Sequence, residues 1–177
     1  KMPRGVAVDS GGNVYVADFG NHAVRKISGT KVTTLAGLGS SGYLDGPNTK
    51  ALFKDPEDMV VDSAGVVYVA DSGNNRIQVY DTLAQRWWSM GSAGTGAGQF
   101  NQPYGIDLDS AGNLWVADAG NDRIQRWTAA TGAWTVWGGV RGTGLGQFNG
   151  PFDIQVDSLG NVFVADHYNR RVQKRTA

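Results

Sequence analysis

Short apolar stretches alternate with turn-forming residues along the whole chain, and one pattern of them occurs four times. Its clearest part is a five-residue apolar stretch that ends in aspartate, at residues 14–18, 67–71, 114–118 and 162–166. The four aspartates are 53, 47 and 48 residues apart. Self-similarity with such a period indicates stacked copies of one supersecondary unit. We number the four copies repeats 1 to 4.

Each repeat predicts a first strand that starts at proline and ends at aspartate, over residues 3–9, 56–62, 103–109 and 151–157. Proline cannot donate an amide hydrogen to a neighbouring strand, so it suits the start of a strand. The turn pattern Asp-Ser-x-Gly follows. It predicts a hairpin because Asp and Ser side chains bind turn amides and Gly accepts a positive φ. The five-residue apolar stretch is then the second strand.

A turn of the type x-Gly-Asn leads to a predicted third strand, over residues 23–27, 76–80, 123–127 and 171–175. A fourth strand is predicted in the first three repeats, over residues 32–35, 87–90 and 134–137. No 3.6-residue period is long enough for a regular helix, and β-branched and aromatic residues fill the strands, so the fold class is all-β. Four antiparallel strands in each repeat are typical of a β-propeller blade.

The predicted architecture is a propeller segment of four four-stranded blades, the last without its outer strand, within a single domain 1–177. The blades span about residues 3–38, 56–92, 103–139 and 151–177. The second strands are apolar on both faces, as expected for sheets that neighbours cover on both sides. Because one blade is incomplete, we expect the chain to be part of a larger propeller or of an assembly.

The connectors between repeats carry a pattern of their own. Residues 94–103 (GTGAGQFNQP) return almost unchanged as residues 142–151 (GTGLGQFNGP). A phenylalanine stands three residues before each proline, and we expect it to insert between blades: Phe53, Phe100 and Phe148. Tryptophans of the outer strands are predicted to pack between blades in the same way, in preference to stacking on sugars or another protein, because aromatic residues dominate buried interfaces. They are Trp87, Trp88, Trp134 and Trp137.

Charge and composition narrow the function classes. Lys plus Arg and Asp plus Glu number 16 each, so the formal net charge is zero. Nucleic-acid binding depends largely on neutralised phosphates, so no nucleic-acid partner is expected. No apolar run approaches about 18 residues, so no membrane insertion is expected either. The chain has no cysteine, which removes disulfides, thiol catalysis and Cys–zinc sites.

Taken together, the proline-led first strand, the Asp-Ser-x-Gly-Asn turn, the Val-Ala-Asp-x-Gly-Asn stretch and the Gly-Gln-Phe-Asn connector resemble the NHL-repeat family. The resemblance covers essentially the whole chain. It implies a propeller, commonly six-bladed, and several possible roles: protein-interaction module, RNA reader, extracellular sensor or adhesion domain, and metal-dependent amidating lyase. Lyase-like members use histidines that face the channel, and this chain has only His22 and His167.

Residues that are the same in every repeat are attributed to folding, and residues that differ are candidates for recognition. We therefore expect Asp18, Asp71, Asp118 and Asp166 to cap the turns that follow them, with the turn asparagines in the left-handed position. The variable loop and channel positions form the predicted partner-binding surface, because aromatic residues and arginine are typical of protein contacts. They are Arg4, Phe19, His22, Glu57, Asp58, Tyr104, Asp107, Asp122, Phe152, Asp153, His167, Tyr168 and Arg170.

The sequence thus favours a non-enzymatic binding or scaffold module whose partner is a protein or further copies or blades of the same kind. No catalytic residue, metal or cofactor is assigned, although Asp58, Asp107 and Asp153 could hold a hard cation at the channel mouth. One alternative is a metal-dependent lyase or hydrolase of the amidating-lyase type that needs additional blades. A second is an RNA-binding NHL domain.

Overall fold

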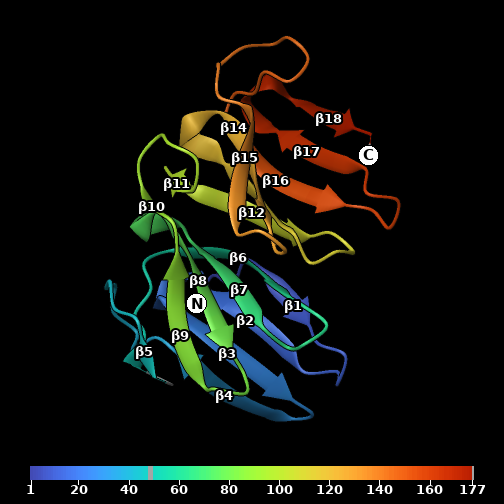
Figure 1. The fold of residues 1–177 in the computed structure, drawn as a ribbon. Helices are drawn as coiled ribbons and strands as arrows, with labels where there is room; N and C mark the ends of the chain where they lie inside the picture. The colour runs from blue at the N-terminus through green and yellow to red at the C-terminus, as the bar shows by residue number, and fades with distance from the viewer. Residues whose placement is uncertain (48–49, 177) are drawn as a thin grey trace. The chain divides into compact units, whose positions relative to one another are not determined.

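A computed structural model describes residues 1–47 and 50–176 of the chain. The chain divides into two compact units, Lys1–Met90 and Gly91–Ala177, and each contains two of the four repeats. Both units consist of β-sheets, and within each repeat the strands lie side by side in chain order (Figure 1). No helix in the described part is long and apolar enough to cross a membrane.

In unit 1, repeat 1 forms a four-stranded antiparallel meander. Its strands are β1 (Val6–Val8), β2 (Val14–Asp18), β3 (Ala23–Ser28) and β4 (Lys31–Ala36). Repeat 2 repeats the meander with β6 (Pro56–Val61), β7 (Val67–Asp71), β8 (Arg76–Asp81) and β9 (Arg86–Met90). A two-residue strand from the connector, β5 (Gly46–Pro47), pairs with β9 and extends this sheet to five strands.

In unit 2, repeat 3 forms a four-stranded antiparallel meander. Its strands are β12 (Pro103–Leu108), β13 (Leu114–Asp118), β14 (Arg123–Thr128) and β15 (Ala133–Gly138). The described part of repeat 4 holds three strands, β16 (Pro151–Val156), β17 (Val162–Asp166) and β18 (Arg171–Arg175). The connector before repeat 3 contains a short parallel pair, β10 (Ser92–Ala93) and β11 (Gln99–Phe100).

The predicted meander is confirmed in all four repeats. The second strands have the predicted bounds, and the third and fourth strands differ from the prediction by at most one residue at either end. In repeat 1 the first strand begins later than predicted, because its pairing is irregular: Ala17 accepts from the Arg4 amide and donates to the Gly5 carbonyl. The sequence did not predict β5, β10 or β11, which are two-residue pairings in glycine-rich connectors with no periodic pattern.

The hydrophobic core of unit 1 lies between the sheets of repeats 1 and 2. Tyr15 and Ala17 of β2 belong to the same buried cluster as Val67 and Val69 of β7. Phe53 of the connector lies in this cluster and meets Trp87 edge to face, with ring centroids 5.1 Å apart. The prediction that the connector phenylalanine inserts between neighbouring sheets is confirmed here.

Unit 2 is built in the same way. Phe148 is completely buried in a cluster that contains Ala117 of β13 and Val164 of β17. Its ring meets Trp137 edge to face at 4.9 Å. The prediction that outer-strand tryptophans pack into these junctions holds for Trp87 and Trp137. It is wrong for Trp88, whose side chain points to solvent because it lies on the opposite face of β9 from Trp87.

The hairpin turns between first and second strands are confirmed as Asp-capped turns. In repeat 1, Asp9 Oδ1 accepts the backbone amides of Gly11 at 3.0 Å and Asn13 at 2.9 Å. The Asn13 side chain also donates to Asp9, and these bonds lower the pKa of the Asp9 carboxyl despite the opposing effect of burial. The same arrangement occurs at Asp109 and Asp157. Hydrogen bonds within the turn thus account for these repeated aspartates without a ligand.

We expect Phe148→Ala to destabilise the fold by about 3–5 kcal/mol, because the substitution leaves a cavity that the surrounding β-sheets cannot fill. Denaturant unfolding followed by tryptophan fluorescence measures this change. Leu145→Ala in the same connector is the matched control, since that side chain is exposed and its removal is expected to change stability by less than about 0.5 kcal/mol. Equal effects of the two substitutions would contradict the inserted-phenylalanine account.

Candidate functional site

The first strand of each later repeat bulges just after its proline. In β12 the pairing with β13 is regular from Ile106 onward but shifts between Pro103 and Ile106. A similar shift follows Pro56 in β6 and Pro151 in β16. A bulge re-aims the side chains that it contains. Here these include Tyr104 and its equivalent in repeat 4, two of the residues predicted to bind a partner.

The second feature that positions the site is a buried carboxylate at the end of each second strand. In repeat 3, Asp118 is completely buried. Its Oδ1 accepts the backbone amide of Asn101 at 2.7 Å, and its Oδ2 accepts Arg123 Nε at 2.6 Å and Gln125 Nε2 at 3.0 Å. Arg123 also donates to the Gln99 carbonyl at 2.7 Å. This aspartate clamp fastens the connector to the end of the blade sheet.

The aspartate clamp recurs in repeats 2 and 4. Asp71 pairs with Arg76 at 2.8 Å and accepts the Lys54 amide at 2.7 Å, and both side chains of the ion pair are completely buried. Asp166 pairs with Arg171 at 2.8 Å and accepts the Asn149 amide at 2.8 Å. In repeat 1, alanine replaces the first arginine of the third strand. Arg25, two residues later, donates to Asp18 at 2.9 Å in its place.

The structure corrects the predicted roles of these aspartates and of the turn asparagines. The aspartates accept bonds from a connector 17 residues earlier instead of capping the turns that follow them. The left-handed conformation falls one residue after the asparagine, at His22, Asn75, Asp122 and Arg170, with φ between 49° and 55°. The turn asparagine instead donates to the clamp aspartate, as Asn121 does to Asp118 at 2.9 Å. Both residues are therefore structural: the aspartate binds the connector 17 residues earlier, and the asparagine binds the aspartate.

The turns held by the clamp carry the candidate site. They are the three-residue 3-10 turns η1 (Phe19–Asn21), η3 (Ser72–Asn74), η4 (Ala119–Asn121) and η5 (His167–Asn169). In repeats 1 to 3 their central residue is glycine, and a Cβ there would come within 2.8 Å of the backbone carbonyl oxygen of Lys1, Lys54 or Asn101. Repeat 4 has Tyr168 at this position. Its ring lies over Gly150, where a Cβ would be only 2.5 Å from the tyrosine ring.

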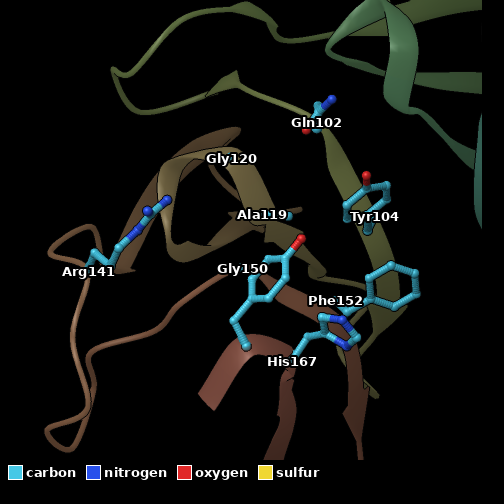
Figure 2. Close-up of a pocket in the computed structure, with 9 residues that line it drawn as sticks. Gln102, Tyr104, Ala119, Gly120, Arg141, Gly150, Phe152 and His167 are labelled. Atoms are coloured by element: carbon cyan, nitrogen blue, oxygen red, sulfur yellow. The ribbon is translucent and has the colours of Figure 1, made fainter. Parts of the chain in front are cut away.

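Within unit 2, these turns and bulges enclose a pocket of about 270 Å³ (Figure 2). Figure 2 shows Tyr104 and Phe152 next to each other, His167 beside Phe152, and Arg141 on the opposite side. The residues that line the pocket are Gln102, Tyr104, Ala119, Gly120, Arg141, Gly150, Phe152, His167 and Tyr168. Four of them, Tyr104, Phe152, His167 and Tyr168, belong to the surface predicted from the sequence.

The four predicted pocket residues form a continuous chain of ring contacts. Tyr104 and Phe152 lie with centroids 4.8 Å apart and planes tilted by 31°. Phe152 contacts His167 at 5.6 Å, and His167 meets Tyr168 edge to face at 4.9 Å. Phe152, His167 and Tyr168 are nevertheless exposed. Aromatic side chains that pack on one another while remaining exposed offer a rigid apolar surface to a ligand.

Arg141 supplies the positive charge at this pocket, and Asp122 holds it in place. Asp122 Oδ2 accepts Arg141 Nε at 2.9 Å, while Asp122 Oδ1 accepts the Gly150 amide at 2.9 Å. Asp122 is buried, so its predicted role in partner contact becomes a supporting one. Arg141 is largely exposed. Comparison of the repeats in the sequence did not identify Arg141 as a site residue. One signal was available: the equivalent residue of the preceding connector is Ala93, so the two connectors differ at this position.

Unit 1 has an ion pair where unit 2 has the aromatic pocket. Arg4 and Glu57 stand in the positions of Tyr104 and Phe152, and the Arg4 guanidinium bonds to the Glu57 carboxylate. Arg4 also stacks over Phe19, 4.0 Å from the ring centroid. Burial raises the pKa of Glu57, and the bond with Arg4 opposes that rise. Arg4 therefore contacts both of the other predicted site residues, Phe19 and Glu57.

The remaining predicted residues take other positions. His22 Nδ1 accepts the backbone amide of Asp55 at 3.2 Å. Asp107 Oδ2 accepts the Val156 amide at 2.7 Å and so links β12 to β16, and burial raises the pKa of its carboxyl. Three further predicted residues lie outside the residues that line the pocket: Asp58, Asp153 and Arg170.

The described residues do not bring together the ligand types needed for a metal site. Among residues 1–47 and 50–176, no group of three or more His, Asp or Glu side chains is placed to hold one metal ion. Asp107, which the sequence suggested as a cation ligand, uses its two oxygens for backbone amides. His22 belongs to unit 1 and His167 to unit 2.

Comparison with known proteins gives the family. The model of the NHL repeat matches residues 1–27, 53–80 and 100–127. These three segments of the chain are NHL repeats. Each matched segment ends within or at the end of the third strand of a repeat. The three strands of repeat 4 follow the same order as the first three strands of these NHL repeats, and its aspartate clamp is the one found in repeats 2 and 3.

Two curated relatives resemble part of the chain. The human NHL repeat-containing protein 3 is 36% identical over 89 residues, 48% of this chain and 24% of that protein. The probable peptidyl-alpha-hydroxyglycine alpha-amidating lyase pgal-1 of Caenorhabditis elegans is 35% identical over 81 residues, 45% of this chain and 23% of that protein. The matched segment thus spans about a quarter of the length of each relative.

Among solved structures, a chain of the nidogen/laminin complex superposes on 99% of this chain with a TM-score of 0.76. The two are 20% identical, and the match covers 61% of that chain. This likeness supports a propeller-like fold for the NHL repeats described here.

The Asp166→Asn substitution tests the aspartate clamp. Burial by itself raises the pKa of Asp166, but bonds from Asn169, the Asn149 amide and Arg171 outweigh it and lower the pKa below its usual range. A carboxyl with a lowered folded-state pKa stabilises the fold above its unfolded pKa, and that stability is lost as the pH falls through the folded pKa. We therefore expect Asp166→Asn to cost about 2–3 kcal/mol at pH 7.

The pH dependence of the free energy of unfolding distinguishes the effect of the Asp166 charge from the effect of its packing. Denaturant unfolding at a series of pH values is expected to show that the gap between wild type and Asp166→Asn narrows as the pH falls below about 4. Leu159→Asn on an exposed hairpin of the same repeat is the control and should show no such narrowing. A gap that stays constant with pH would contradict the role of the carboxylate.

Proposed function

We propose that this chain is a binding module that consists of consecutive blades of an NHL propeller and recognises a protein segment through the pocket of repeats 3 and 4. The observation that carries the proposal is the exposed ring chain of Tyr104, Phe152, His167 and Tyr168. It lies on bulges and turns that the repeat framework holds rigidly. Binding residues are typically placed on loops of a rigid scaffold in this way.

The pocket is where repeats 3 and 4 depart from the repeat pattern. Tyr168 replaces a turn glycine, and Gly150 replaces the glutamine of the preceding connector, Gln102. The first change needs the second, because the tyrosine ring occupies the space where a Cβ of residue 150 would lie. Folding alone requires neither change, since repeats 1 to 3 fold without them. These two linked changes, at Tyr168 and Gly150, support a role of the pocket in recognition.

The chemistry of the pocket favours a segment with an aromatic or aliphatic side chain next to a carboxylate. The rings of Phe152 and Tyr168 offer apolar surface, and Arg141 offers a guanidinium whose geometry matches a carboxylate. A volume of about 270 Å³ suits one inserted side chain, because sites for whole small molecules are usually about 300–1,000 Å³. The similar fold within a nidogen/laminin complex supports a protein partner.

A pair of small probes tests this site directly. N-acetyl-phenylalanine has an aromatic ring and a free carboxylate, while N-acetyl-phenylalaninamide lacks the charge. We expect NMR titration of the labelled chain to shift resonances of His167 and its neighbours, with the amide binding about tenfold more weakly. Tyr168→Ala should abolish the shifts, and Leu145→Ala should leave them unchanged. Shifts elsewhere, or equal binding of both probes, would argue against this pocket chemistry.

The function itself is tested by selecting random peptides displayed on phage against the wild-type chain and against Tyr168→Ala. Selection is expected to enrich peptides with an aromatic or aliphatic residue beside Asp, Glu or the free C-terminus. Their affinity for wild type, measured by calorimetry, should exceed that for the variant by at least about tenfold. The proposal fails if no enriched peptide distinguishes the two proteins.

The similarity to an amidating lyase favours a second candidate function, a metal-dependent lyase. Among the described residues, no three His, Asp or Glu side chains are placed to hold a metal ion. Such an enzyme would therefore have to take metal ligands from elsewhere. We expect elemental analysis of the chain purified without chelator to find less than about 0.1 equivalent of zinc or calcium. Stoichiometric metal that survives dialysis would favour the lyase over the binding module.

A further inference from the structure

A second hollow region of unit 2 lies at the start of β13, whereas the aromatic pocket follows the end of that strand. Two adjoining cavities of about 270 and 250 Å³ occur there. Both are lined by Trp115 of β13, Arg126 of β14 and Arg175 of β18, and we call these three residues the arginine cleft. None of them lines the aromatic pocket, so the two sites are separate.

Strand pairing brings the three side chains to one junction. Trp115 pairs with Arg126 across β13 and β14, so their side chains lie on the same face of repeat 3. That face packs on repeat 4, because Trp115 belongs to the same buried cluster as Val162 and Val164 of β17. Arg175 pairs with Val162 across β17 and β18, which places it on the face of repeat 4 that packs on repeat 3. The arginine cleft therefore lies within a junction between two repeats.

Tryptophan rings limit where both guanidinium groups can lie. The Arg126 Cζ is 5.3 Å from the centroid of the Trp115 ring, and the Arg175 Cζ is 5.9 Å from the same centroid. Arg175 is also 5.7 Å from the ring centroid of Trp137. Distances below about 6 Å are those of cation–π contacts. The two cations are thus held beside one shared ring.

The arginine cleft has more hydrogen-bond donors than acceptors. In the described part of the chain, the one hydrogen bond of the Arg126 side chain is a long contact from Nη2 to Asp109 Oδ2 at 3.4 Å, and its buried Nε has no partner. Asp109 also accepts two amides of its hairpin turn and the Trp115 Nε1. No carboxylate that the structure describes forms an ion pair with Arg175. Because a guanidinium has five N–H donors, most donors here have no acceptor among the described residues.

The equivalent junction of unit 1 has one cation instead of two. There the Lys26 ammonium lies 5.2 Å from the centroid of the Tyr15 ring, as Arg126 lies beside its own aromatic neighbour. The residue equivalent to Arg175 is Tyr80, which belongs to the apolar cluster of unit 1. A cation beside an aromatic ring is therefore common to both junctions, and the second cation is particular to unit 2.

From this arrangement we propose that the arginine cleft binds the phosphate group of a small ligand, either free phosphate or a sugar phosphate. Two neighbouring like charges repel one another, and a dianion between them removes that repulsion. Guanidinium groups also match phosphate oxygens with pairs of parallel hydrogen bonds. Together the two cavities reach the usual size of small-molecule sites, about 300–1,000 Å³. The Trp137 ring lines one of them and offers a surface for a sugar.

Titration with inorganic phosphate, followed by NMR, tests the proposal. Phosphate replaces chloride at constant ionic strength while the indole N–H resonances of the labelled chain are recorded. We expect the Trp115 resonance to shift with a dissociation constant below about 10 mM. Acetate, which has one charge, should bind at least about fivefold more weakly. No shift at Trp115, or equal binding of acetate and phosphate, would overturn the proposal.

Two variants separate a specific site from a general effect of charge. Arg175→Tyr introduces the residue that unit 1 has at the equivalent position, and it should weaken phosphate binding at least about tenfold. Lys174→Gln is the matched control because it also removes one positive charge, from the opposite face of β18, where the Lys174 ammonium lies over Phe163. It should change the affinity by less than about twofold. Equal losses in the two variants would contradict a specific site.

Thermal unfolding provides a measurement that does not depend on NMR assignments. Phosphate should raise the unfolding temperature of wild type and of Lys174→Gln but not that of Arg175→Tyr, because a ligand stabilises only a folded state that binds it. Circular dichroism shows whether each variant is folded, and Arg175→Gln replaces Arg175→Tyr if the tyrosine prevents folding. An equal rise in wild type and in the Arg175 variant would overturn the assignment.

Glucose 6-phosphate distinguishes the two sources of the phosphate group. Tighter binding than that of inorganic phosphate would assign the arginine cleft to a sugar phosphate, and equal affinity would assign it to free phosphate. Glucose alone should not shift the Trp115 resonance, and binding of glucose as tight as that of its phosphate would overturn the proposal. The result is independent of the aromatic pocket, since Tyr168→Ala should leave phosphate binding unchanged.

Discussion

The buried ion pair between aspartate and arginine is the interaction on which the rest of this structure depends. Two charges removed from water are costly unless each finds a full set of bonds. Asp71 and Arg76 meet this demand: the aspartate accepts a connector amide and the guanidinium, and the arginine donates to the Leu52 carbonyl at 3.0 Å. Because the partners come from the connector and from two strands, the pair can form only when all three are in register. The pair thus makes each connector part of the blade that follows it.

Two consequences extend from this pair to packing and to the candidate site. A connector fixed by polar bonds can place Phe53 or Phe148 between two sheets, so the polar and the apolar parts of each junction stabilise one another. The same pair fixes the turn at the end of the second strand. His167 and Tyr168 follow Asp166 directly, so their rings are held where β16 brings Phe152. The ion pair therefore holds the pocket residues in place.

The sequence predicted most of the fold because repetition converts one weak local pattern into four agreeing ones. It predicted the bounds of every second strand, the three strands of repeat 4 and the aromatic members of the pocket. It did not predict what Asp118 binds, because its partner amide at Asn101 lies 17 residues earlier and no local rule connects the two. For the same reason Asp122 was expected on the surface, although the fold turns it toward Gly150 and buries it. Long-range contacts of this kind become visible only in three dimensions.

Equivalent positions in the repeats also provide an internal comparison that a non-repetitive protein lacks. Where the residue is the same and its burial is the same, as at Asp71, Asp118 and Asp166, the repeat explains it. Where the residue changes while its backbone position is kept, as at Tyr168, the change must be accommodated by a neighbour, and Gly150 provides the space. A glycine with φ of 56° tolerates the crowding that a side chain would not. These two linked changes make repeat 4 differ from the other repeats, and the binding surface that we propose is the physical reason we offer for them.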